Sequence, residues 1–97
     1  HISDIVIGIL KASDKDNRCE IYNLGNNKPI KLMSFIKILE KIVNLEFDKE
    51  YLPMQPGDVH TTYADIDLTK SELDWEPKIE IKEGLTEFYD WYKEYYK

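Results

Sequence analysis

The feature that most constrains this chain is an amphipathic segment near its middle. The segment carries a full apolar stripe at helical spacing, formed by Leu32, Phe35, Ile36, Leu39, Ile42 and Val43. Lysines and a glutamate occupy the opposite side of the same segment. The pattern predicts a helix from about residue 31 to 44 that buries one face against other apolar segments.

A second helix is predicted near the start of the chain, over residues 2–12. Its apolar side chains also recur at helical spacing: Ile2, Ile5, Val6, Ile9 and Leu10. Ser3 or Asp4 is expected to cap the first turn. Ile7 and Gly8 lie on another side, and a helix that is apolar on more than one face usually packs against two neighbours. Because the chain also lacks an initiator methionine, we expect it to be a piece of a longer protein.

The remaining pattern predicts two more helices and two short strands. A brief helix is expected from Asp65 or Asp67 to Trp75, and a terminal helix has an apolar face of Leu85, Phe88, Tyr89, Tyr92 and Tyr95. Residues 19–24 and 47–52 have the residue types of strands, and residues 53–58 have the prolines and glycine of a rigid turn. These elements predict one α+β domain over residues 1–97, with about four helices and several short strands.

The composition of the chain argues against two classes of partner, nucleic acids and membranes. The formal net charge of -6 opposes the long-range attraction that nucleic acids require of a protein surface. No apolar run approaches the roughly 20 residues that a membrane helix needs. The single cysteine, Cys19, can form no internal disulfide and is interpreted as a small core residue. We therefore expect a cytoplasmic protein that binds neither nucleic acid nor membrane.

Several short motifs imitate active sites but are better explained by packing. Tyr89 and Lys93 have the Tyr-x-x-x-Lys spacing of dehydrogenase active sites, yet Tyr89 belongs to the apolar face of the terminal helix. Ser34 and Lys37 have the Ser-x-x-Lys spacing of penicillin-binding enzymes without the partner motifs. The histidines and Cys19 lack paired metal-ligand spacing, and no glycine-rich phosphate loop occurs. We therefore expect no catalytic residue, metal site or cofactor-binding motif within this chain.

A set of segments, taken in order, carries a family resemblance across the whole chain. The segments are His1-Ile-Ser-Asp4, Ile21-Tyr-Asn-Leu-Gly25, Leu-Pro-Met-Gln-Pro-Gly-Asp-Val at 52–59, Tyr63-Ala-Asp65, Leu73-Asp-Trp-Glu-Pro77 and Gly84-Leu85. Together they closely resemble the C-terminal region of NAD-dependent sugar epimerase/dehydratases, which are extended short-chain dehydrogenase/reductases. The Met-Gln-Pro-Gly-Asp-Val form looks most like the UDP-glucuronate 4-epimerases.

The resemblance implies that this chain is the substrate-binding part of a two-domain enzyme. In the family, an N-terminal Rossmann domain holds NAD and the catalytic Ser/Thr, Tyr and Lys, while the smaller C-terminal domain binds the nucleoside diphosphate of the sugar. This chain resembles only the latter and lacks the Rossmann domain. We therefore expect NAD and a UDP-sugar to be ligands of the parent enzyme, and the chain alone to be inactive.

The family pattern indicates candidate substrate-binding residues. Gln55 and Asp58 are expected to bond the diphosphate or ribose hydroxyls, and Gly57 to permit close approach. Galactose epimerases generally carry arginine at the position of Gln55, so neutralisation of the phosphates falls to other residues. Ile30 corresponds to an aliphatic contact with base or ribose, or is an ordinary core residue at a helix start. Thr62 corresponds to a position beside the sugar pocket, or is a plain loop residue.

Asp74 stands where the family commonly has glycine before the tryptophan. Aspartate enters the left-handed helical region more readily than most residues, so this departure is physically tolerable.

Two alternative functions stay open at this point. The parent is also compatible with a nucleotide-sugar dehydratase or reductase, since those enzymes share the architecture and differ mainly at catalytic residues outside this chain. The chain is also compatible with a non-enzymatic interaction module that docks through its aromatic tail and an exposed helix. In either case, we expect the apolar side of the helix over residues 2–12 to promote self-association.

Overall fold

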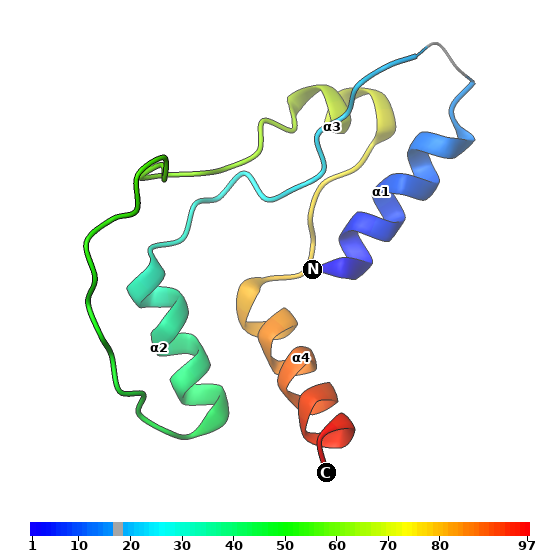
Figure 1. The fold of residues 1–97 in the computed structure, drawn as a ribbon. Helices are drawn as coiled ribbons and strands as arrows, with labels where there is room; N and C mark the ends of the chain where they lie inside the picture. Colours follow the sequence, from blue (N-terminus) through cyan, green and yellow to red (C-terminus); the bar gives the residue numbers. More distant parts are fainter. Residues whose placement is uncertain (17–18) are drawn as a thin grey trace. The chain divides into compact units, whose positions relative to one another are not determined.

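The computed structural model describes residues 1–16 and 19–97. They form four helices joined by irregular segments (Figure 1): α1 (Ile2–Asp14), α2 (Leu32–Val43), α3 (Asp67–Leu73) and α4 (Ile81–Tyr95). The described residues contain no strand, so the expected α+β class is wrong and the fold is all-α. The chain divides into two compact units, the first made of His1–Pro29 with Tyr63–Glu80 and the second of Ile30–Thr62 with Ile81–Lys97.

Both expected strands are wrong because neither segment finds a backbone partner in the described residues. A strand needs a repeating ladder of backbone hydrogen bonds with a neighbour. Near residues 19–24, Asn23 instead bonds through its side chain to the Asp65 carbonyl, at 3.0 Å, and its carbonyl accepts from the Thr69 hydroxyl, at 2.8 Å. In residues 47–52, the Phe47 amide donates to a side chain of α2. Residues 19–24 and 47–52 therefore have the residue types of strands but form no sheet in the described structure.

A small buried cluster holds the first unit together. Ile66, Leu73 and Trp75 form its centre, with Ala12, Tyr22, Leu24 and Ala64 packed around them. Helix α1 approaches this cluster closely at Gly8, where an added Cβ would lie 2.6 Å from Leu24 Cδ2. The glycine therefore sets how near the helix backbone comes to the cluster.

Asp4 connects α1 to the chain that follows α3. Its carboxylate accepts from the backbone amides of Lys78, at 3.1 Å, and Ile79, at 3.0 Å, while its carbonyl accepts from Trp75 Nε1, at 2.8 Å. The expected cap at Ser3 or Asp4 is therefore wrong. The helix is capped by His1, whose side chain accepts from the Ser3 amide, because the Asp4 carboxylate is occupied by these distant amides.

Helix α3 confirms the predicted brief helix, but it ends at Leu73, two residues before the predicted Trp75, and it is not capped as predicted. Its C-cap, Asp74, has φ of 49°, which confirms the expectation that aspartate adopts the left-handed conformation here. Its N-cap is Ile66, which has no side-chain capping bond, so the expected capping role of Asp65 or Asp67 is wrong. Asp65 instead accepts from the Asp67 amide in a local turn, at 3.2 Å.

Helices α2 and α4 form the second unit. The apolar stripe predicted for residues 31–44 is confirmed as a helix, and most of its members are half-buried against neighbours in this unit. Helix α4 confirms the predicted terminal helix and places Leu85 and Tyr89 among its half-buried side chains. Helix α2 ends at Val43 and is followed by its C-cap, Asn44, whose left-handed backbone, φ 59°, turns the chain back along the helix.

Candidate functional site

A tight turn at residues 55–58 forms the centre of the candidate site. The Asp58 amide donates to the Gln55 carbonyl, at 3.2 Å, and Gly57 has φ of 93°. Proline at the second position and a positive-φ glycine at the third are the signature of a type II turn. Such a turn brings its first and fourth residues close together, so the backbone places Gln55 and Asp58 next to each other.

The side chains of this turn are available to a ligand. Gln55, Gly57 and Asp58 are all exposed, and a Cβ added at Gly57 would meet no atom within 4 Å. The glycine is therefore required by its backbone angle and not by crowding within the chain. An amide and a carboxylate side by side can donate to a phosphate oxygen and accept from a hydroxyl, respectively.

The other two predicted residues lie in the same unit but outside the turn. Ile30 lies shortly before α2 and is 45% exposed, and Thr62 is an exposed residue at the end of the loop. Neither takes part in the hydrogen bond that closes the turn. The structure thus brings three of the five predicted residues together and leaves Ile30 and Thr62 as separate candidates.

An ion pair that the sequence did not reveal fixes the chain that leads to this turn. Glu40 of α2 bonds the Lys49 ammonium and accepts from the Phe47 amide, at 2.9 Å. The bond to Lys49, and then that to Phe47, lowers the pKa of the Glu40 carboxyl below its usual value. Glu40 in turn raises the pKa of Lys49. Nine residues separate the partners, and no helical or strand period predicts such a contact.

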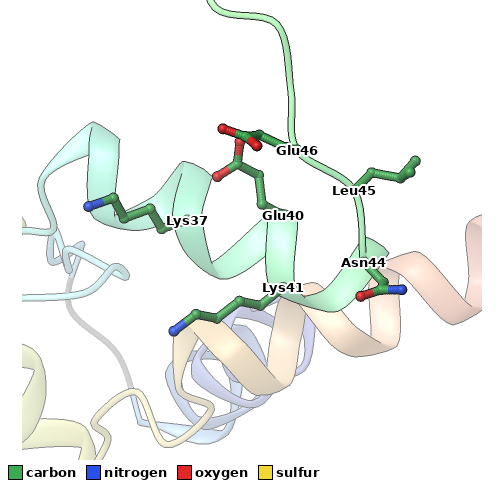
Figure 2. Close-up of a pocket in the computed structure, with 6 residues that line it drawn as sticks. All are labelled: Lys37, Glu40, Lys41, Asn44, Leu45 and Glu46. Carbon is green, nitrogen blue, oxygen red and sulfur yellow. The ribbon is translucent and has the colours of Figure 1, made fainter.

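A shallow pocket lies beside this ion pair, at the C-terminal end of α2. Figure 2 shows its lining residues, which are Lys37, Glu40, Lys41, Asn44, Leu45 and Glu46. None of the five residues predicted for substrate binding lines it. Glu40 and Glu46 extend toward each other, whereas Lys37 and Lys41 extend away from them (Figure 2). The pocket combines both signs of charge and does not by itself define a ligand.

The Tyr89 and Lys93 pair, which imitates a dehydrogenase active site, lies on the surface of α4 with other contacts. Lys93 pairs with Asp90, at 2.8 Å, and lies over the Tyr89 ring, 4.7 Å from its centroid. The bond to Asp90 raises the pKa of Lys93, so this lysine is held in its charged form on the helix surface. Cys19 is exposed, so its interpretation as a core residue is wrong. No group of three or more metal-ligating side chains occurs within residues 1–16 and 19–97.

The part of the chain that the structure describes contains no helix long and apolar enough to cross a membrane.

The fold of the chain has a close match in a solved structure of a nucleotide-sugar epimerase. A UDP-glucuronic acid 4-epimerase variant of Bacillus cereus superimposes with a TM-score of 0.86 and 29% identity, over 97% of this chain and 31% of that chain. That crystal structure contains NAD and UDP-4-deoxy-4-fluoro-glucuronic acid. No family model matches the chain.

Sequence comparison leads to the same enzymes. A UDP-glucuronate 4-epimerase of Thermodesulfobacterium geofontis is 43% identical over 97% of this chain. An uncharacterised protein of Methanocaldococcus jannaschii is 51% identical, also over 97%. The chain spans 29% of the length of each relative. The predicted resemblance to UDP-glucuronate 4-epimerases is therefore confirmed.

Proposed function

We propose that this chain is the UDP-sugar-binding portion of a nucleotide-sugar 4-epimerase, specifically a UDP-glucuronate 4-epimerase. The observation that carries the proposal is the type II turn, whose backbone brings Gln55 and Asp58 close together while both stay exposed. The similarity of nearly the whole chain to epimerases of this kind supports it.

Each predicted residue has a chemical task in this proposal. The Gln55 amide donates to a diphosphate oxygen, and the Asp58 carboxylate accepts from a ribose hydroxyl, each bond contributing about 1 kcal/mol. Gly57 leaves room for the ligand because it has no side chain. Ile30 offers an aliphatic contact to the base or ribose, and Thr62 leaves space beside the sugar. None of these residues supplies the positive charge that a diphosphate attracts.

In this proposal, parts of the parent enzyme outside the 97 residues carry out catalysis and bind NAD. NAD would supply hydride transfer at C4 of the sugar when bound by the parent. The turn before α2, at Gly25-Asn26-Asn27, is too glycine-poor to cradle a dinucleotide, so we assign no NAD contact to this chain. We expect the purified chain to show no epimerase activity. Turnover of UDP-glucuronate by the chain alone would contradict this assignment.

Calorimetric titration of the chain with UDP, and separately with UDP-glucuronate, tests the proposed site. Saturable binding that is lost in a Gln55→Ala, Asp58→Ala double variant is the expected result. Asp48→Ala is a matched control, since Asp48 is an exposed carboxylate of the same unit outside the turn. Equal binding by the double variant and the control would place the nucleotide elsewhere.

The proposal also extends to the partner and location of the chain. Helix α1 exposes Ile2, Val6, Ile9 and Leu10, and we propose that this face causes the isolated chain to self-associate. We further propose a cytoplasmic location, where a protein with the single thiol of Cys19 needs no disulfide.

A further inference from the structure

The ion pair between Glu40 and Lys49 is more enclosed than the ion pairs on the surfaces of the other helices. The Lys49 side chain is 22% exposed and that of Glu40 is 16% exposed. The corresponding pairs of Lys15, Lys70 and Lys93 have side chains that are between 34% and 62% exposed. Partial removal from water strengthens the attraction between two charges, so this pair is the better candidate for a positioning role.

The pair belongs to a closed set of bonds around Phe47. Glu40 Oε1 accepts from the Phe47 amide, at 2.9 Å, and from Lys49, while Lys49 Nζ also donates to the Phe47 carbonyl, at 2.9 Å. The Leu45 amide donates to the Glu40 carbonyl, at 3.2 Å. These bonds fix residues 45–49 against α2 although the segment has no secondary structure of its own.

The chain between this ion pair and the Gln55–Asp58 turn is short and contains a proline. Six residue steps separate Lys49 from Gln55, which limits their separation to about 20 Å. Residues 50–54 are exposed, but Pro53 and Pro56 restrict their own φ angles and the conformations of the residues before them. Anchoring Lys49 therefore limits the positions that the turn can occupy. The limit is tighter than it would be if a flexible, glycine-rich linker joined Lys49 to the turn.

We propose that Glu40 and Lys49 are positioning residues that hold the Gln55–Asp58 turn in place for the nucleotide. The inference rests on the proposed function of that turn. The two residues act through residues 50–54 and do not themselves touch the ligand. Their loss should make the turn more mobile and weaken nucleotide binding, while leaving the contacting side chains intact.

The test compares Glu40→Gln and Lys49→Met with a Lys49→Arg variant that can restore the ion pair. Lys41→Met is the matched control, since Lys41 is an exposed lysine of the same helix that makes none of these bonds. Hydrogen exchange at the Asp58 amide reports on the closed turn, and calorimetry reports the Kd for UDP. In Glu40→Gln and Lys49→Met, we expect the exchange rate of the Asp58 amide and the Kd for UDP each to rise about two- to fivefold. In Lys49→Arg, we expect both values to return toward those of the wild type.

The two readouts separate this inference from the proposed function. Loss of UDP binding only in the Gln55→Ala, Asp58→Ala variant, with no change in the ion-pair variants, would refute the positioning role and leave the function standing. Faster Asp58 exchange in a chain that binds no UDP would refute the nucleotide role. Equal acceleration at the Lys70 amide, which bonds the Ile66 carbonyl at 2.8 Å in the other unit, would indicate general destabilisation and also refute positioning.

Discussion

At the residue scale, Gly57 tests whether the turn conformation matters for binding. Its φ of 93° strains any residue with a Cβ, yet the surrounding space is open, so Gly57→Ala changes the backbone preference without a clash. We expect the free energy of unfolding to fall by about 1 kcal/mol and UDP affinity to fall about fivefold. Gly57→Asn should lose less stability and less UDP affinity than Gly57→Ala, because asparagine adopts positive φ more readily than alanine. Urea denaturation and calorimetry measure the two effects, and an alanine variant that binds as tightly as the wild type would show that this conformation is dispensable.

Asp4 is a buried carboxylate that joins two segments of the first unit. It is 4% exposed, and its two carboxylate oxygens each accept one backbone amide. In Asp4→Asn only one side-chain oxygen remains to accept, so one of the amides of Lys78 and Ile79 loses its partner. Leaving such a group unsatisfied should lower the free energy of unfolding by about 1–3 kcal/mol. Urea denaturation compared with Asp14→Asn, an exposed change on the same helix, provides the measurement, and equal stability of the two variants would contradict this account.

At the scale of elements, the Glu40 carboxylate links α2 to the following segment in a pH-dependent way. Lys49 and the Phe47 amide lower the Glu40 pKa in the folded chain, against the raising effect of desolvation. A lowered folded pKa means that the stabilisation is present above the unfolded pKa of about 4.3 and is lost as pH falls through the folded value. Below pH 4.5, we therefore expect thermal stability to fall less steeply in Glu40→Gln than in the wild type. Glu46→Gln is the matched control, and parallel acid curves for the wild type and Glu40→Gln would refute the linkage.

The elements also show what sequence can and cannot predict. The four helices were predictable because their apolar periodicity is local, and the turn was predictable because Pro56 and Gly57 encode it within four residues. The strands were not, because a ladder depends on a distant partner, and residues 19–24 have none within the described part of the chain. The Glu40–Lys49 ion pair was equally hidden, since it depends on the left-handed backbone of Asn44 that turns the chain back. The family resemblance thus indicated the candidate contacts, but neither it nor the local pattern indicated the residues proposed to position them.

At the scale of the whole molecule, α1 distributes its side chains unusually for a surface helix. It buries Asp4 and Gly8 and leaves Ile2, Val6, Ile9 and Leu10 exposed. The large apolar residues therefore contribute little to the core of the first unit. An uncovered face of this kind lowers its free energy by packing against another apolar surface, and we propose that a second copy supplies one in the isolated chain.

This face makes self-association of the chain a testable property. In Val6→Lys, Ile9→Lys, the apolar face is interrupted at two exposed positions, so the chain should stay folded and shift toward monomer. The net charge changes from -6 to -4 because two lysines are added, which reduces general repulsion between copies. Dissociation would therefore reflect loss of apolar contact and not greater repulsion. Leu32→Lys, Val59→Lys adds the same charge at exposed apolar sites of the other unit, and should leave the association unchanged. Sedimentation equilibrium measures the outcome, and a wild-type chain that is monomeric at high concentration would refute the role of α1.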